Sequence, residues 1–286
     1  MDRFGISAAL LTPFDEDGVL DETLFVRHMA SVLSEGADGV TLFGTTGEGA
    51  SIGFGERLAG LDHAIGAGIP SERIVMGVCA TSVSDAADQV ARAGERGIRD
   101  FLLLPPFYFK GCSDSGLFHW HAALFARTDP HMRFIVYHIP QVTGVPLSVA
   151  LVGRLAAAFP ERILAIKDSS GDWENAQSLL SLKALPVLIG DERVLHRAAA
   201  LGGAGAITGM ANLYPARMKR LFETATEDTS LSEEVTRIVS GPVIPALKAV
   251  LAERTGEPGW EHLRPPLEPL DAAARHAVLG RSAEVA

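Results

Sequence analysis

The sequence has few cysteines, no long apolar run and no cluster of basic residues. Its two cysteines, Cys79 and Cys112, are too few for a disulfide framework and are not spaced like zinc ligands, so we expect two free thiols. No apolar run approaches the roughly 18 residues that a membrane helix requires. Residues 1–5 also lack the features of a secretory signal. These absences predict a cytoplasmic protein that does not bind a membrane.

Positive charge is also scarce. Asp and Glu together number 35 and Lys and Arg 25, which gives a net charge of −10 with neutral histidines. Because no run of Lys or Arg suggests a basic groove, we expect no binding to nucleic acid. An anionic small-molecule substrate would need positive groups within its own site.

Eight short apolar runs rich in Val, Ile and Leu alternate with segments of helical spacing. One such segment follows Asp21 and is stopped by Gly36, and another covers residues 82–97. Runs of this length are typical of strands buried on both faces, and eight strand–helix units predict a closed (β/α)8 barrel. An open doubly wound sheet is the alternative. The eight runs cover residues 6–14, 39–44, 73–80, 100–106, 134–140, 164–170, 186–190 and 205–209.

Strand-like runs cease after about residue 231. Residues 243–253 and 270–279 have helical spacing on either side of Pro265-Pro266. We therefore predict a catalytic barrel over residues 1–225 and a helical C-terminal extension over residues 226–286.

Lys167 lies within the sixth apolar run, in Ala165-Ile166-Lys167-Asp168. The active site of such a barrel lies at the C-terminal ends of its strands. Burial disfavours the ammonium form of a lysine, and the neutral amine can attack a ketone to give an imine. That imine is an electron sink for making or breaking an adjacent carbon–carbon bond. The alternative is a lysine that reaches solvent or pairs with Asp168 or Asp172.

Two further runs suit this chemistry. Gly44-Thr45-Thr46-Gly47-Glu48-Gly49 follows the second strand, where hydroxyls and backbone N–H groups could hold a carboxylate; the alternative is an ordinary glycine-rich turn. Tyr137 lies in the fifth strand, where its phenol would face Lys167 and move protons; the alternative is a tyrosine of the core. His138 should point the other way, because successive strand residues alternate.

Together with the aromatic run Pro105-Pro106-Phe107-Tyr108-Phe109-Lys110 after the fourth strand, these runs resemble the dihydrodipicolinate synthase and N-acetylneuraminate lyase family, with similarity from residue 6 to about residue 221. The resemblance implies a homotetramer, a dimer of dimers, that needs no metal or organic cofactor. It implies that Lys167 forms the imine, Tyr137 relays protons, and Thr45 and Thr46 hold the substrate carboxylate beside Gly47. Tyr108 would reach a neighbouring subunit's site and extend the relay through Thr45. Gly190 and Ile207 fall where the family lines its site.

Departures from the family pattern bear on the substrate. Val142 stands where the synthases usually carry an arginine that holds the second substrate's carboxylate. Ser169, Asp191 and Glu192 match positions where the sugar-acid lyases contact substrate hydroxyls. We therefore predict a Schiff-base lyase or aldolase acting on pyruvate or a hydroxylated 2-keto acid, such as a 2-keto-3-deoxy sugar acid. The alternatives are dihydrodipicolinate synthase, a dehydratase or deaminase of a related keto acid, and a non-catalytic 2-keto acid sensor.

Overall fold

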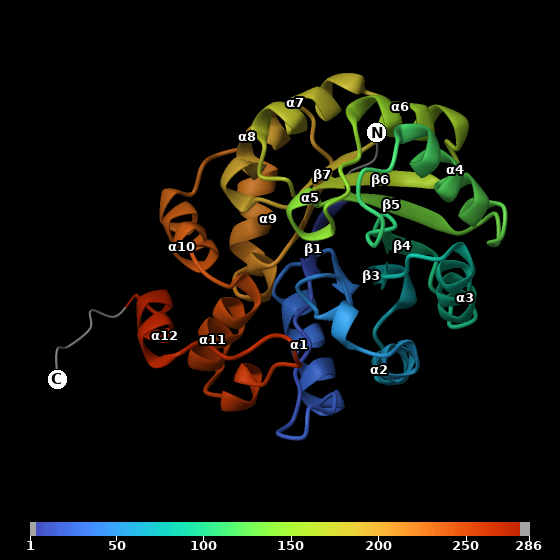
Figure 1. The fold of residues 1–286 in the computed structure, drawn as a ribbon. Coiled ribbons are helices and arrows are strands. Elements are labelled where there is room, and N and C mark those ends of the chain that lie inside the picture. Colours follow the sequence, from blue (N-terminus) through green and yellow to red (C-terminus); the bar gives the residue numbers. More distant parts are fainter. Residues whose placement is uncertain (1–3, 281–286) are drawn as a thin grey trace.

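The computed structural model describes residues 4–280, and within them eight parallel strands close into a barrel in chain order (Figure 1). The predicted (β/α)8 barrel is confirmed, and the open-sheet alternative is wrong because β1 pairs with β8. Each strand is shorter than the apolar run that predicted it, since the run continues into the loop above the barrel. The strands are β1 (Gly5–Ala9), β2 (Gly39–Leu42), β3 (Ile74–Val78), β4 (Asp100–Leu103), β5 (Arg133–His138), β6 (Ile163–Asp168), β7 (Val187–Ile189) and β8 (Gly205–Thr208).

The strands are apolar because side chains on both of their faces are buried. Ile135, Tyr137 and Ala165 belong to the cluster inside the barrel, whereas Val136 and Ile166 pack outward against the helices. This alternation brings Tyr137 and Lys167 together, because they are register partners on β5 and β6. His138 points away as expected, and its Nδ1 accepts a hydrogen bond from the backbone N–H of Leu147 at 3.0 Å.

Helices surround the barrel, and their starts follow local capping rules. Asp21 accepts from the N–H of Leu24 at the first helix, and Ser82 accepts from that of Asp85 at the third, so both predicted starts hold to within a residue. No helix within residues 4–280 is both long and apolar enough to cross a membrane. The helices around the barrel are α1 (Glu22–Ser34), α2 (Phe54–Gly66), α3 (Val83–Gly94), α4 (Asp114–Phe125), α5 (Pro140–Thr143), α6 (Val149–Ala158), α7 (Trp173–Leu182), α8 (Leu195–Ala200) and α9 (Pro215–Thr224).

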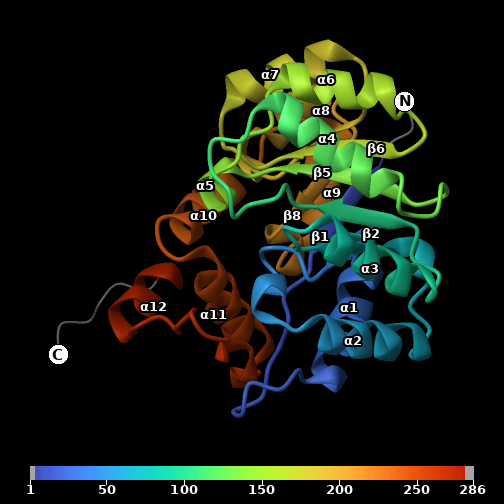
Figure 2. The same cartoon turned by 45° about the vertical axis from the view of Figure 1, so that its right-hand side comes forward.

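Up to residue 280, three more helices follow the barrel: α10 (Thr229–Val239), α11 (Val243–Thr255) and α12 (Ala272–Val278). They lie together beside α9 and α1, in orange to red (Figures 1 and 2). Arg27 of α1 donates to Glu257, just after α11, at 2.5 Å. Helix α10 has no counterpart in the prediction, and the boundary at residue 225 falls in the short connection between α9 and α10.

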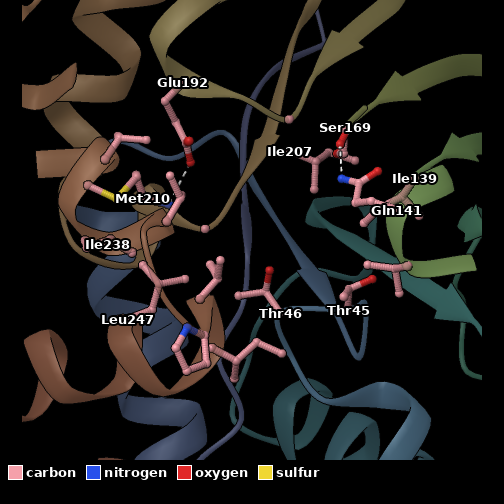
Figure 3. Close-up of a pocket in the computed structure, with 18 of the residues that line it drawn as sticks. Thr45, Thr46, Ile139, Gln141, Ser169, Glu192, Ile207, Met210, Ile238 and Leu247 are labelled. Carbon is pink, nitrogen blue, oxygen red and sulfur yellow. Dashed lines mark hydrogen bonds between the residues drawn. The ribbon is translucent and has the colours of Figure 1, made fainter. Parts of the chain in front are cut away.

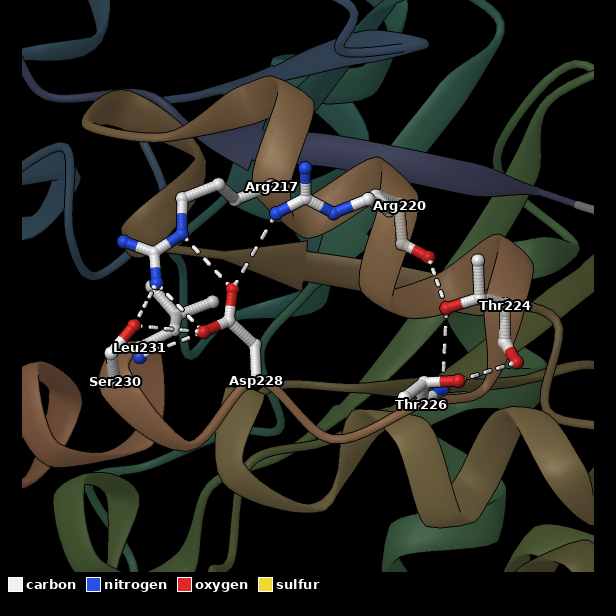
Figure 4. A network of polar contacts seen from close by, with 7 residues as sticks. All are labelled: Arg217, Arg220, Thr224, Thr226, Asp228, Ser230 and Leu231. Carbon is white, nitrogen blue, oxygen red and sulfur yellow. Dashed lines mark hydrogen bonds and ion pairs between the residues drawn. The ribbon is translucent and has the colours of Figure 1, made fainter.

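An ion-pair network fixes the connection from α9 to α10 (Figure 4). Arg217 donates through two nitrogens to the carboxylate of Asp228, at 3.0 and 2.7 Å, and Arg220 lies 3.9 Å from it. Asp228 also caps α10 by accepting from the N–H of Leu231. The bond from Arg217, more than any other contact, lowers the pKa of Asp228 to about 2.

We expect Asp228→Asn to lose stability in a pH-dependent way. Asparagine can still cap α10, so the variant removes mainly the charge that Arg217 binds. The folded pKa lies below the unfolded one, so this stabilisation is complete above about pH 4 and disappears as the pH falls towards 2. Urea midpoints of the two proteins should differ at pH 6 and converge only as the pH falls to about 2. A difference that does not change with pH would contradict this role.

Candidate active site

Lys167 and Tyr137 form the centre of the candidate site, inside the upper end of the barrel. Both side chains are buried, and Lys167 Nζ lies 3.2 Å from the Tyr137 hydroxyl oxygen. The same nitrogen lies 4.3 Å from the centroid of the tyrosine ring. The amine therefore neither reaches solvent nor pairs with Asp168 or Asp172, and its polar neighbour is a group that can exchange protons with it.

The environment of Tyr137 favours its ionised form. Burial alone would raise the pKa of the phenol, but the charge of Lys167 and hydrogen bonds with Thr45, Lys167 and Ser169 together lower it. A phenol in this environment gives up and regains a proton more easily than one in a purely apolar core. Such exchange is what a proton relay beside an amine requires.

The loop after β2 carries Thr45 and Thr46 and is held in one conformation. Phe43 and Glu48, on either side of it, have positive φ angles of 54° and 55°, which residues other than glycine rarely adopt. Gly49 has no room for a side chain, because a Cβ there would collide with the carbonyl oxygen of Phe43. The two threonines are therefore presented on a strained, closely packed loop.

A buried ion pair anchors this loop to the C-terminal helices. Glu48 Oε1 lies 2.5 Å from Nζ of Lys248 in α11, and neither side chain is exposed. Lys248 also donates to the carbonyl of His262 at 2.7 Å, and Glu48 Oε2 accepts from the N–H of Arg264 at 3.1 Å. Burial lowers the pKa of Lys248 to about 8, although Glu48 opposes the shift. Glu48 thus fixes the loop to the C-terminal helices.

A cavity of about 380 Å³ opens above Lys167 and is lined by residues of the barrel and of the C-terminal helices (Figure 3). Its size is typical of small-molecule sites. Most of the residues predicted for the site line this cavity. They are Thr45, Thr46, Tyr137, Lys167, Ser169, Gly190, Glu192 and Ile207.

Three predicted residues lie outside the cavity. Gly47 packs under the loop, where its carbonyl accepts from Thr12 at 2.8 Å and a Cβ would lie 2.6 Å from the carbonyl oxygen of Leu10. Asp191 caps a short 3-10 helix and pairs with Arg193 at 2.7 Å. Tyr108 is 74% exposed on the loop after β4 and stacks edge-on against Phe109. Within one chain, therefore, these three do not reach the amine.

Glu192 is the acidic residue of the cavity. Its carboxylate accepts from the hydroxyl of Thr208 and from the N–H of Met210, the latter at 3.1 Å (Figure 3). Burial raises the pKa of Glu192, against these hydrogen bonds. The side chain is thus held as a hydrogen-bonding group on the wall of the cavity.

The sequence prediction missed one side of the cavity altogether. We call this side the apolar wall, and it consists of Val235, Ile238, Val239, Pro242, Val243, Ile244, Pro245 and Leu247, from α10, α11 and the turn between them. The spacing of Val235, Ile238 and Val239 is that of one helix face and could have indicated it. Gln141 was also missed; it lines the cavity and donates to the carbonyl of Ser169 at 2.6 Å.

No group of three or more His, Cys, Asp or Glu side chains is placed to hold a metal ion within residues 4–280. The reactive groups that the chain itself supplies to the cavity are an amine, a phenol, two threonine hydroxyls, a serine hydroxyl and the carboxyl group of Glu192. A parallel barrel that presents an interior lysine beside a tyrosine at the C-terminal ends of its strands has the architecture of a class I, Schiff-base lyase.

The chain belongs to the dihydrodipicolinate synthetase family, whose model matches residues 2–281. Members of this family are class I Schiff-base lyases, and the chain is an enzyme of that class.

Similar proteins are known from several organisms. A DapA-like lyase of Chloroflexus aurantiacus, described as uncharacterized, is 33% identical over 93% of this chain and 91% of its own. A crystal structure of dihydrodipicolinate synthase from Agrobacterium tumefaciens is 46% identical, with a TM-score of 0.95 over 97% of this chain and 98% of that one. A 4-hydroxy-tetrahydrodipicolinate synthase of Methanococcoides burtonii is 27% identical over 94% and 93% of the two chains.

Proposed function

We propose that the protein is a Schiff-base aldolase or lyase in which Lys167 forms an imine with pyruvate or a hydroxylated 2-keto acid. The observation that carries this proposal is the buried amine, 3.2 Å from the Tyr137 hydroxyl, at the bottom of a cavity that also contains Thr45 and Thr46. A lysine with only a structural role would not need an open cavity and a proton-exchanging partner together.

Each group has a step in this reaction. Thr45 and Thr46 hold the substrate carboxylate, which places the keto carbon beside Nζ of Lys167. The amine attacks that carbon and water leaves, so the imine forms. In the cleavage direction Tyr137 takes the proton of the hydroxyl at C4, the bond between C3 and C4 breaks, and the imine nitrogen accepts the electrons. The aldehyde leaves, C3 of the resulting enamine takes the proton held by Tyr137, and hydrolysis of the imine then releases pyruvate and restores the amine, with no metal or organic cofactor needed.

Two polar side chains of the cavity are available to a substrate hydroxyl. Ser169 lines the cavity next to Tyr137, and Gly190 leaves room for it, since a Cβ at that position would collide with the serine hydroxyl. Glu192 lies on the cavity wall with its carboxylate fixed. These two residues support a hydroxylated 2-keto acid; Asp191, engaged by Arg193, does not add to them.

The exposed loop that carries Tyr108 indicates that the chain forms an oligomer. Tyr108 and Phe109 are 74% and 71% exposed on the loop above the barrel, which is costly for two neighbouring aromatic rings in an isolated chain. We propose that this loop packs against a second copy in a homotetramer, where Tyr108 reaches the site of the adjoining subunit.

Trapping of the imine tests the mechanism. The protein is incubated with pyruvate and sodium borohydride, digested and analysed by mass spectrometry. We expect a reduced pyruvyl adduct on the peptide that contains Lys167 and on no other lysine. Absence of any adduct would exclude the imine mechanism and would favour the non-catalytic sensor.

Dihydrodipicolinate synthase itself is the second candidate, because the solved structure that shares 46% identity bears this name. Val142 argues against it, since no guanidinium then meets the second carboxylate. A coupled assay with pyruvate and aspartate semialdehyde distinguishes the two functions. Analysis of the products distinguishes both from a dehydratase or deaminase, which would release water or ammonia and no aldehyde.

A further inference from the structure

We infer that the apolar wall is a subsite for an alkyl or aryl group, so that the aldehyde portion of the substrate is apolar beyond its reacting carbon. This inference rests on the proposed function, because it concerns the part of the substrate farthest from Lys167. It replaces the sugar-acid tail expected from the sequence with a tail that has no further hydroxyls or carboxylate.

The cavity has a polar side and an apolar side. Thr45, Ser169 and Gln141 lie on one side in Figure 3, while Met210, Ile238 and Leu247 lie across from them. A keto acid held by the threonines therefore directs its remote end towards the apolar wall. Glu192 lies on the same side as Met210, but the eight residues of the apolar wall themselves offer that end no side-chain hydrogen-bond donor or acceptor.

Apolar side chains are left exposed at the opening of the cavity. Val142, Val239 and Val243 are 59%, 38% and 40% exposed, and all three line the cavity. They come from α5, α10 and α11, so three separate elements direct an uncovered valine to the same opening. Exposed apolar groups gathered in a concave site mark the place where an apolar ligand group is removed from water.

The charged residues of the cavity also disfavour a substrate with a second carboxylate. Lys167 and Glu192 are the charged residues among those that line the cavity within residues 4–280, and Lys167 is committed to the imine. Glu192 is engaged as an acceptor by Thr208 and Met210, and Val142 offers a second carboxylate no donor. A polyol tail would also bind weakly, because its hydroxyls would lose their hydrogen bonds to water at the apolar wall without gaining hydrogen-bond partners there.

The reaction follows from these contacts. In the synthetic direction, the pyruvyl imine on Lys167 loses a proton from C3 to Tyr137 and becomes an enamine. C3 of this enamine attacks the carbonyl carbon of the aldehyde, the imine forms again, and Tyr137 returns the proton to the carbonyl oxygen as the new C4 hydroxyl. Water released when the imine formed is consumed when it hydrolyses. Pyruvate and one aldehyde thus give one 4-hydroxy-2-keto acid, whose alkyl or aryl group rests on the apolar wall.

The test compares three aldehydes as partners for pyruvate: benzaldehyde, D-glyceraldehyde and aspartate semialdehyde. We expect kcat/KM for benzaldehyde to exceed that for either polar aldehyde by about tenfold or more. A preference for glyceraldehyde or aspartate semialdehyde by the wild-type protein, which still forms the pyruvyl adduct, would overturn the inference. Failure to form that adduct would instead overturn the proposed function.

A variant pair removes the intrinsic reactivity of the aldehydes from the comparison. Val243→Asp places a charge on the apolar wall at the first turn of α11, a position where helices accept acidic residues. Val19→Asp makes the same change at a valine that is 57% exposed and does not line the cavity. We expect only Val243→Asp to lower kcat/KM for benzaldehyde, by about tenfold. Equal behaviour of the two variants would contradict the subsite.

Discussion

Lys167→Ala is expected to lower kcat for aldol cleavage or condensation by about 10⁴-fold or more, because the variant lacks the atom that bonds to the substrate. The cavity otherwise keeps Thr45, Thr46 and Tyr137, so binding of pyruvate should weaken much less than turnover. Steady-state kinetics with pyruvate and the preferred aldehyde measure the loss. Borohydride trapping of the same variant should give no pyruvyl adduct.

Tyr137→Phe is the matched control for this prediction. It keeps the ring that packs inside the barrel and removes only the hydroxyl 3.2 Å from Nζ of Lys167. We expect it to lower kcat by about 10²-fold to 10⁴-fold while the adduct on Lys167 still forms, more slowly. An adduct that persists in Lys167→Ala, on Lys248 for example, would contradict the assignment of the imine.

Lys248→Met should destabilise the protein by about 3–5 kcal/mol, because it leaves the Glu48 carboxylate buried without its cation. Methionine has nearly the length of lysine, so the change in packing is small. Urea unfolding at neutral pH measures the loss. Since Glu48 belongs to the loop that carries Thr45 and Thr46, we also expect a higher KM for pyruvate in this variant.

The double variant Glu48→Gln with Lys248→Met separates charge from packing. It removes both ionised groups, so much of the stability lost in Lys248→Met should return. Glutamine can still accept from the N–H of Arg264, which keeps the end of the loop in place. If the double variant is no more stable than the single one, the buried charge is not the cause of the loss.

The barrel could be predicted from the sequence because strands buried on both faces are recognisable as short apolar runs. Their ends could not, since residues such as Leu10 and Leu11 remain buried in the loop above the strand. Helix α10 was missed because the absence of strand-like runs after residue 231 says nothing about which polar segment is helical. Its buried positions, Leu231, Val235 and Ile238, become evident once the barrel gives them a surface to cover.

The centre of the site could also be predicted, since adjacent parallel strands bring register partners such as Tyr137 and Lys167 together. On the far side, the spacing of Val235, Ile238 and Val239 indicates a helix face, but it does not show that this face lines the cavity, because α10 and α11 reach it through tertiary packing. Asp191 and Glu192 illustrate the limit of local reasoning. They are neighbours in sequence, yet one pairs with Arg193 and the other faces the cavity.

The contact between Glu48 and Lys248 has a consequence for synthesis on the ribosome. The loop that carries Thr45 and Thr46 is translated early, but the lysine that neutralises its buried glutamate is translated 200 residues later. His262 and Arg264, which complete the anchor, follow later still. A nascent chain released before α11 could close its barrel and still lack a fixed carboxylate-binding loop, so substrate binding should be among the last properties the protein acquires.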